Sequence, residues 1–99
     1  MAKMKSSPRD AAESLAIQAL TWLSGDGERL GRFLTLAGLG PQSLRAAARE
    51  PGFLAAVLEH VSGDQALLKE FAAETGFEPV DVDRARRVLA GGDWERETP

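Results

Sequence analysis

The chain has 99 residues, of which 43% are apolar and 27% charged, with a net charge of −3 and no cysteine. This is the length of one domain, since domains cluster at about 100–150 residues, and no stretch approaches the roughly 18 apolar residues of a membrane helix. The missing cysteine excludes disulfides, thiolate zinc sites, iron–sulfur clusters and cysteine nucleophiles.

Three helices are predicted in the first half of the chain. Ser7-Pro8 supplies an N-cap and a first helical residue, and Gly25 is expected to end this helix in the left-handed conformation. Asp26 caps a second helix, which ends at Gly38, and a shorter third helix starts at Gly40-Pro41. The spacing of apolar residues predicts the inward positions: Ala12, Leu15, Ala16, Ala19, Trp22, Leu23, Leu30, Phe33, Leu34, Ala37, Leu44, Ala47 and Ala48.

Three more helices are predicted in the second half. The fourth starts at Pro51, Asp64 caps the fifth, which ends at Gly76, and the sixth runs from Pro79 to Gly91-Gly92. Their inward positions are Leu54, Val57, Leu58, Val61, Leu67, Leu68, Phe71, Ala72, Val82, Ala85, Val88 and Leu89, and Phe53 is expected beside the stripe of the fourth helix. Because no segment shows the alternation of a strand, the fold is predicted to be all-α, a compact bundle of about six short helices.

An internal duplication is predicted from the alignment of residues 15–49 with residues 53–87, an offset of 38. Ten of the 35 aligned positions are identical, where about three identities would arise by chance from this composition. The identical residues include capping, turn and core positions: Leu20 and Leu58, Ser24-Gly25-Asp26 and Ser62-Gly63-Asp64, Leu30 and Leu68, Phe33 and Phe71, Gly38 and Gly76, Pro41 and Pro79, Ala47 and Ala85, and Arg49 and Arg87. We therefore expect two tandem copies of a three-helix unit, at about residues 8–50 and 51–91.

The two helices around Gly76 are similar to a helix-turn-helix pair. The small Ala72 lies four residues before this glycine and Val82 lies six residues after it, which is the spacing of such pairs in DNA-binding repressors. Three arginines follow as candidate nucleic-acid contacts: Arg84, Arg86 and Arg87. However, the start of this helix carries the acidic residues Glu78, Asp81 and Asp83, which phosphates repel, so binding to nucleic acid is kept only as the alternative hypothesis.

Residues for catalysis or metal binding do not form a recognisable pattern. His60 is the only histidine, and the acidic residues Glu13, Glu59 and Asp64 do not stand at a known metal-ligand spacing from it. No serine has a histidine beside it, so a catalytic triad is not indicated. His60 aligns with Trp22 in the duplication, which suggests two half-buried positions at the edge of the core. We expect a protein that is not an enzyme and that uses no cofactor or metal.

Four apolar residues are candidates for contact with a partner: Trp94, Leu36, Leu39 and Phe77. Trp94 lies in a polar tail, residues 93–99, and exposed tryptophans are common at binding hot spots. Packing back onto the bundle, or a frayed tail, is the favoured interpretation of this residue. Leu39 and Phe77 each follow a helix-ending glycine, where an apolar residue also serves the helix end itself. The single helical domain is predicted at residues 7–92, after a disordered segment at residues 1–6.

Longer strings of the sequence resemble a known family. They are AIQALTWLSGD, RFLTLAGLGPQSLRAAA, PGFLAAVLEHV and FAAETGFEPVDVDRARRVLAG, and they are similar to the small all-helical proteins of domain-of-unknown-function family 3572, found mainly in alphaproteobacteria. The resemblance covers about residues 14–91 and implies a short cytoplasmic bacterial protein without an assigned activity. It supplies no catalytic motif.

Together these observations favour a non-enzymatic helical module that acts by contact with a protein, either an unidentified partner or a second copy of itself. A cytoplasmic location is expected, because the basic N-terminus is followed by charged residues and not by the apolar core of a secretory signal. Nucleic-acid binding through the pair around Gly76 is the alternative, and a small-molecule site between the two units has no polar residues to support it.

Overall fold

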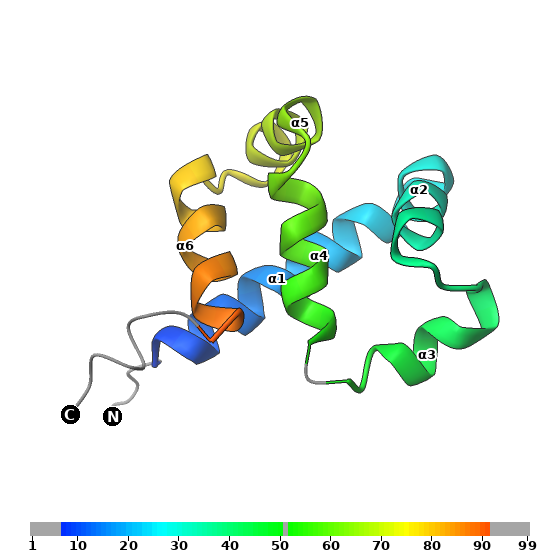
Figure 1. Ribbon diagram of the computed structural model, residues 1–99. Coiled ribbons are helices and arrows are strands. Elements are labelled where there is room, and N and C mark those ends of the chain that lie inside the picture. The colour runs from blue at the N-terminus through cyan, green and yellow to red at the C-terminus, as the bar shows by residue number, and fades with distance from the viewer. Residues whose placement is uncertain (1–6, 51, 92–99) are drawn as a thin grey trace.

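The computed structural model describes residues 7–50 and 52–91 (Figure 1). Within them the helices are α1 (Pro8–Ser24), α2 (Gly27–Ala37), α3 (Leu44–Ala47), α4 (Phe53–Ser62), α5 (Gln65–Thr75) and α6 (Pro79–Leu89), with a short 3-10 helix, η1 (Pro41–Ser43), directly before α3. No strand occurs in these two ranges, so the prediction of an all-α fold of about six short helices is confirmed. The predicted disordered segment and polar tail lie outside the described residues.

The predicted N-caps begin their helices as expected. The Ser7 side chain accepts a hydrogen bond from the Asp10 backbone N–H at 3.0 Å, and Pro8 is the first residue of α1. Asp26 accepts from the Glu28 backbone N–H at 2.9 Å, and Asp64 accepts from the Leu67 backbone N–H at 3.2 Å. These contacts satisfy backbone donors that have no partner within the helix, which is why α1, α2 and α5 start where they do.

The reason given for the glycine at the end of α1 is wrong. Gly25 has φ −74° and ψ −8°, a right-handed conformation open to any residue. Its counterpart after α4, Gly63, has φ −78°, and a Cβ atom there would stand 3.0 Å from the Glu59 carbonyl oxygen, so close approach of the backbone explains this glycine. Left-handed glycines do end α2 and α5, at Gly38 (φ 75°) and Gly76 (φ 88°).

The core is formed by five of the six helices. Its buried residues are Ala12, Leu15, Ala16, Ala19, Leu23, Phe33, Leu34, Phe53, Val57, Leu58, Val61, Phe71, Val82, Ala85 and Val88. All of them except Phe53 are among the predicted inward positions, and Phe53 is the residue expected beside the stripe of its helix. Of the other predicted positions, Ala37 and Ala48 are exposed, which contradicts the prediction for these two alanines. The two phenylalanines that align in the predicted duplication, Phe33 and Phe71, are 2% and 0% exposed.

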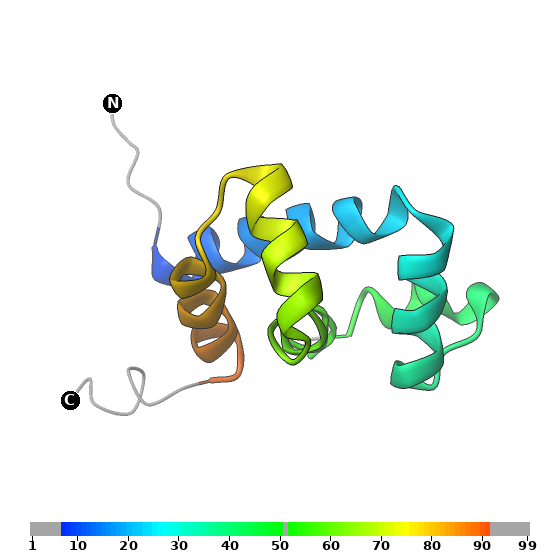
Figure 2. The same cartoon turned by 90° about the horizontal axis from the view of Figure 1, so that it is seen from above.

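Helices α1 and α4 cross at the centre of the molecule, with α6 on one side of α4 and α2 and α3 on the other (Figures 1 and 2). The most extensive helix contacts join α1 with α6, α4 with α6, and α1 with α4. Helix α6 therefore packs mainly against α1 and α4, and much less against α5, its neighbour in the chain. No helix of the described residues is long and apolar enough to cross a membrane.

Helix α3 differs from the other five because it contributes no buried residue. It spans four residues and its main neighbour is η1, the turn directly before it. Leu44 and Ala47 are half-buried and pack against the edge of the core. The third predicted helix is thus present but shorter than its aligned counterpart, α6, and it stands at the periphery (Figure 1).

The helix bounds follow the offset of 38 residues found in the sequence. Helices α1 and α4 end at residues 24 and 62, α2 and α5 span residues 27–37 and 65–75, and η1 and α6 start at residues 41 and 79. The places of α3 and α6 in the fold differ, because α6 is buried between α1 and α4 and α3 is not. The tandem copies of a three-helix unit therefore stay a prediction.

Candidate functional site

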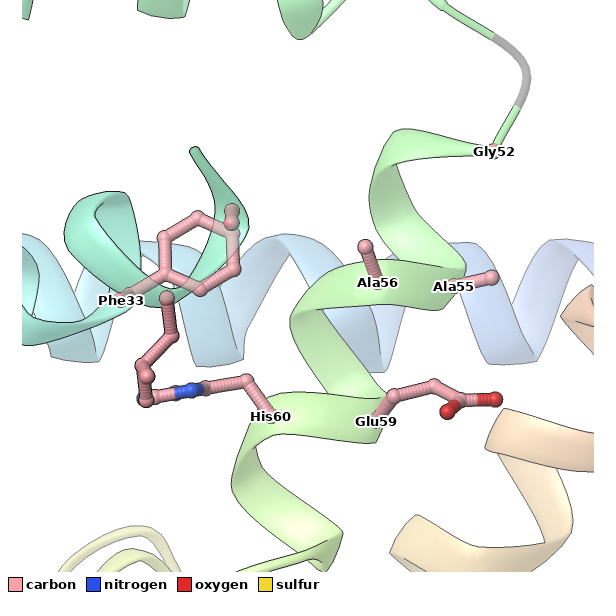
Figure 3. A pocket seen from close by; sticks show the side chains of 8 residues that line it. Phe33, Gly52, Ala55, Ala56, Glu59 and His60 are labelled. Atoms are coloured by element: carbon pink, nitrogen blue, oxygen red, sulfur yellow. The ribbon is translucent and has the colours of Figure 1, made fainter. Parts of the chain in front are cut away.

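An open apolar groove lies between α2 and α4 (Figure 3). It has a volume of about 490 Å³ and we call it the α2–α4 groove; its lining residues are Phe33, Leu36, Ala37, Gly52, Ala55, Ala56, Glu59 and His60. Leu36, on the α2 side, is 71% exposed, the largest value among the exposed large apolar residues described. The groove therefore presents apolar surface to solvent with a leucine at its edge.

The local sequence explains why this groove is open. Gly38 adopts the left-handed conformation, and the Leu39 backbone N–H donates to the Leu34 carbonyl at 2.8 Å, so the chain turns away at the end of α2. No following helix covers Leu36, because α3 packs at the periphery. On the opposite side, Ala55 and Ala56 are too small to fill the space above α4 (Figure 3).

His60 forms one end of the groove. Its ring contacts the edge of Phe33, with 5.2 Å between ring centroids and 65° between the planes. Partial burial lowers the pKa of His60 below its ordinary value, and Arg32 lowers it further, while the nearby Asp64 raises it. Because the lowered pKa favours the neutral ring near neutral pH, His60 offers one hydrogen-bond donor and one acceptor in an apolar setting.

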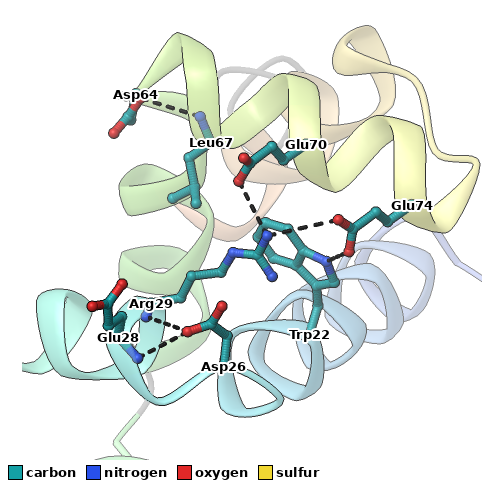
Figure 4. Close-up of polar contacts among 8 residues, drawn as sticks. All are labelled: Trp22, Asp26, Glu28, Arg29, Asp64, Leu67, Glu70 and Glu74. Atoms are coloured by element: carbon teal, nitrogen blue, oxygen red, sulfur yellow. Dashed lines mark hydrogen bonds and ion pairs between the residues drawn. The ribbon is translucent and has the colours of Figure 1, made fainter.

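The corner of the molecule around Trp22, which aligns with His60, is closed by polar contacts (Figure 4). The Trp22 indole N–H donates to Glu74 Oε1 at 2.7 Å, and the Arg29 guanidinium carbon lies 4.1 Å from the Trp22 ring centroid. Arg29 also pairs with Glu70 at 3.2 Å and with Glu74 at 3.7 Å. This Trp22 cluster (Trp22, Arg29, Glu70 and Glu74) joins α1, α2 and α5 on the surface of the bundle.

The two corners correspond position by position at the offset of 38. Trp22 aligns with His60, and the tryptophan contacts Phe71 edge-on just as the histidine contacts Phe33, the phenylalanine aligned with Phe71. Glu74, which accepts the indole hydrogen bond, aligns with Leu36. Where one corner has a carboxylate that closes the surface, the other has an exposed leucine beside an open groove.

The residues predicted to contact a partner have different places in the structure. Leu36 is exposed at the edge of the α2–α4 groove. Leu39 and Phe77 are half-buried and pack against the core, and Phe77 stacks on Phe71 with 5.9 Å between ring centroids. These two residues therefore complete the ends of α2 and α5, the second interpretation given to them above. Trp94 lies outside the described residues.

Carboxylates lie beside all three arginines proposed for nucleic acid. Arg86 and Arg87 each approach an Asp83 oxygen at 2.7 Å, and Arg84 lies 3.7 Å from Asp81. The hydrogen bond from Arg86 is the main cause of the lowered pKa of Asp83, which keeps this carboxyl ionised. Near the groove, Arg86 also lies 3.9 Å from Glu59.

A different set of arginines has no described carboxylate within 4.0 Å. Arg32 is exposed on α2, and Arg45 and Arg49 are exposed on and just after α3. Helices α2 and α3 lie on the same side of α4 in both views of the molecule (Figures 1 and 2). Carboxylates line the two cavities that Arg32 lines, Asp26, Glu28, Asp64 and Glu70 in one and Glu59 and Asp64 in the other. The open corner is therefore bordered by charges of both signs.

Acidic and histidine side chains of the described residues serve helix ends and ion pairs. They form no group of three or more that could hold a metal ion, within residues 7–50 and 52–91. Asp81 accepts a hydrogen bond from the Glu78 backbone N–H at 3.1 Å and so caps the start of α6. Asp83 binds two arginines at the same helix.

Several residues of the groove were missed by the sequence analysis. Ala55 and Ala56 carry no signal of their own, because small residues on a helix are typical of any packed face. Arg32 lines a neighbouring cavity with Leu36 and His60, and its place could have been found, since it stands beside Phe33 and four residues before Leu36 on the same helix. Nothing within α2 alone links these residues with His60, because the link depends on how α2 and α4 pack.

Comparison with known proteins gives a family and nothing more specific. The family model described as "Protein of unknown function (DUF3572)" matches residues 9–92. No curated protein and no solved structure matches the chain.

Proposed function

Since this chain belongs to the DUF3572 family, whose description assigns no function, we propose, from its geometry, that it is a non-enzymatic module that binds another protein through the α2–α4 groove. The observation that carries the proposal is the 71% exposed Leu36 at the edge of an apolar groove of about 490 Å³. Covering one leucine side chain contributes about 1.5–3 kcal/mol, so this edge can serve as an anchor for a partner.

The other exposed large apolar residues support the choice of this groove. Ile17 and Val80 are 52% and 54% exposed. Neither residue lines the α2–α4 groove or the cavity formed by residues of α1 and α6. Scattered exposed apolar residues are normal on a protein surface. An apolar residue beside a concave apolar surface is typical of an interaction site.

The proposal includes a non-catalytic role and the expected cytoplasmic location. The charged side chains Glu59, Arg32 and Asp64 line an open cavity together with His60, but no hydrogen bond or ion pair described for the molecule joins them to the imidazole, and this supports a non-catalytic role. Nucleic acid is a less favoured partner, because the arginines of α6 already lie beside Asp81 and Asp83.

We also propose that the bundle is built from two copies of a three-helix unit whose third helices have diverged. The equal spacing of helix bounds and the matched contacts of Trp22 with Phe71 and His60 with Phe33 support this origin. In this interpretation the second copy keeps its third helix, α6, in the core, and the first copy leaves a surface open for a partner.

Site-specific photo-crosslinking tests the proposed function. A photoreactive phenylalanine analogue replaces Leu36 in the full chain, and the control protein carries it at Val80, an apolar residue of similar exposure on α6. In cells that naturally contain the protein, we expect a discrete crosslinked partner from position 36 and none from position 80. Absence of a position-36 product, or the same products from both positions, would overturn the proposal.

A further inference from the structure

A second open cavity, of about 500 Å³, lies between α1 and α6, and we call it the α1–α6 cavity. Its lining extends from Pro8, the first residue of α1, to Val88 near the end of α6. Five apolar residues that line it are buried or half-buried: Ala12, Leu15, Phe77, Ala85 and Val88. The contact between α1 and α6 therefore leaves apolar surface that the described residues do not cover.

The Trp22 cluster shows how this molecule holds an indole over apolar surface (Figure 4). The Trp22 ring lies edge-on against Phe71, with 5.3 Å between ring centroids. Its N–H donates to Glu74 at 2.7 Å, and the Arg29 guanidinium carbon lies 4.1 Å from the ring centroid. An indole is thus held by an apolar surface, a carboxylate that accepts its N–H, and an arginine over its face.

The same kinds of side chain line the α1–α6 cavity. Arg84 and Asp81 lie 3.7 Å apart at its edge, the same distance that separates Arg29 from Glu74 in the Trp22 cluster. The Arg84 side chain is 69% exposed, so its guanidinium is accessible to a ring. A second carboxylate, Asp10, lines the cavity from α1. Apolar surface with a few polar groups around it is typical of a ligand pocket, and this set of groups suits an indole.

The second tryptophan of the sequence follows α6 closely. Trp94, which lies outside the described residues, stands six positions after Val88 and three after Gly91. Gly91 has φ 74°, the left-handed conformation in which a chain changes direction at the end of a helix. Three residues span at most about 11 Å. Trp94 is therefore tethered close to the end of the cavity at Val88.

We propose that the α1–α6 cavity is occupied by the chain's own C-terminal segment, residues 92–99, with the Trp94 indole inside it. The ring lies over Ala85 and Val88, its N–H donates to Asp81 or Asp10 at the edge, and Arg84 covers its outer face. This inference goes beyond the proposed function and does not depend on it. A cavity that the chain fills itself is closed to partners, so of these two openings only the α2–α4 groove stays available.

Tryptophan fluorescence of the full chain tests the proposal, because the sequence has only two tryptophans. In Trp22→Phe the only one that remains is Trp94. We expect it to emit at shorter wavelength than in the chain unfolded by urea. Its quenching by acrylamide should be about three- to tenfold weaker than in urea, since a pocket covers about 70–90% of the surface of what it binds. Neither value should change with protein concentration, because the segment and the cavity belong to one chain.

The same substitution in each opening provides a matched control. Ala11 lines the α1–α6 cavity, Ala56 lines the α2–α4 groove, and both residues are exposed. Ala11→Arg places a long side chain in the cavity and should return the emission and quenching of Trp94 toward their values in urea. Ala56→Arg should leave both unchanged. Because both positions are exposed, circular dichroism should show the two variants to be as helical as the parent.

A second measurement keeps Trp22 in place, so the test does not depend on the folding of Trp22→Phe. The wild-type chain labelled with 5-fluorotryptophan gives one fluorine resonance for each tryptophan, and Trp94→Phe assigns them. We expect the Trp94 resonance to move on unfolding and with Ala11→Arg, and to stay in place with Ala56→Arg.

Several results would overturn the proposal. They are emission of Trp94 at the wavelength of the unfolded chain, or protection from acrylamide that survives Ala11→Arg. Protection that is lost with Ala56→Arg instead would place the segment in the α2–α4 groove. A shift that appears only as the protein concentration rises would assign the cavity to the segment of a second copy. Crosslinking from position 36 is measured separately, so the failure of this inference and the failure of the proposed function are distinguishable.

Discussion

The two corners of the molecule that correspond at the offset of 38 are built from similar sequences and have different surfaces. At one, the Trp22 indole donates to Glu74 and lies against Arg29, so polar side chains close the bundle. At the other, His60 lies against Phe33 and an exposed Leu36 borders an open groove. The helix ends are alike at both, with a left-handed glycine after α2 and after α5.

This difference shows that the capping residues determine where helices begin and end, and that a few surface side chains decide which corner stays open. One carboxylate in place of a leucine provides an acceptor for an indole and a partner for an arginine. The place of the third helix then determines how much surface remains uncovered. The comparison can be tested by changing aligned positions in pairs.

The largest effects are expected in the core. Phe71→Ala and Phe33→Ala should each lower the free energy of unfolding by about 3–5 kcal/mol. Each ring contacts two aromatic side chains, but the loss should be larger for Phe71, because this ring is fully buried whereas Phe33 borders the open groove. Urea denaturation measures both values, and Leu36→Ala is a control expected within about 0.5 kcal/mol of the wild type. A larger loss from Phe33→Ala would contradict the comparison.

The next effect distinguishes α6 from α3, the helix aligned with it. Arg84→Pro breaks α6 in its middle and should cost about 3 kcal/mol or more. Ala46→Pro, the aligned change in α3, should cost less than about 1 kcal/mol, because the helix is short and contributes no buried residue. Thermal melts measure both changes, and Arg84→Ala controls for loss of the arginine side chain. Equal losses from the two prolines would show that α3 is as important to the fold as α6.

A smaller effect is expected when the closed corner is made like the open one. Glu74→Leu removes the acceptor of the Trp22 indole N–H and one partner of Arg29. Because Glu74 is about half exposed, the cost should be only about 1 kcal/mol. Urea denaturation measures it, and the indole N–H resonance of Trp22 should shift. Glu70→Leu, which removes only an ion pair with Arg29, should cost less and leave that resonance in place.

The smallest expected effect is a pH dependence of the free energy of unfolding, caused by His60 at the open corner. Burial lowers the pKa of His60 below its ordinary value of 6.5, so the unfolded chain binds the proton more readily than the folded one. The contribution of His60 to stability is therefore complete above pH 6.5 and is lost as the pH falls through the lower pKa of the folded state. Urea titrations between about pH 5 and pH 8 should show this loss. It should disappear in His60→Phe, and a slope that persists in that variant would have another source.

Local features of the fold were predictable from the sequence. The serine, aspartate and proline signals at the starts of α1, α2, α5 and α6 act within one turn of the chain, so no tertiary contact is needed to find them. Apolar spacing identified every buried residue except Phe53, which was placed beside the inward stripe of its helix. Gly25 was misinterpreted because sequence alone does not separate a glycine needed for a left-handed conformation from one in an ordinary right-handed turn.

The candidate site was much less predictable. Leu36 was selected because it lies off the apolar stripe of its helix, which is information within α2 alone. The groove needs α2 and α4 to pack side by side and α3 to remain at the periphery, and both depend on contacts between distant residues. The hydrogen bond between Trp22 and Glu74 was not predicted for the same reason, because these residues are 52 positions apart in the chain.

The close packing of α1 against α6 joins nearly opposite ends of the described chain. During synthesis α1 leaves the ribosome before α6, so Ala12 and Leu15, which line a cavity together with residues of α6, cannot meet this neighbour until α6 has emerged. Because a domain folds as a unit, the surface of α1 that packs against α6 stays uncovered up to that point. The order of the helices thus makes the emergence of α6 a condition for closing the core.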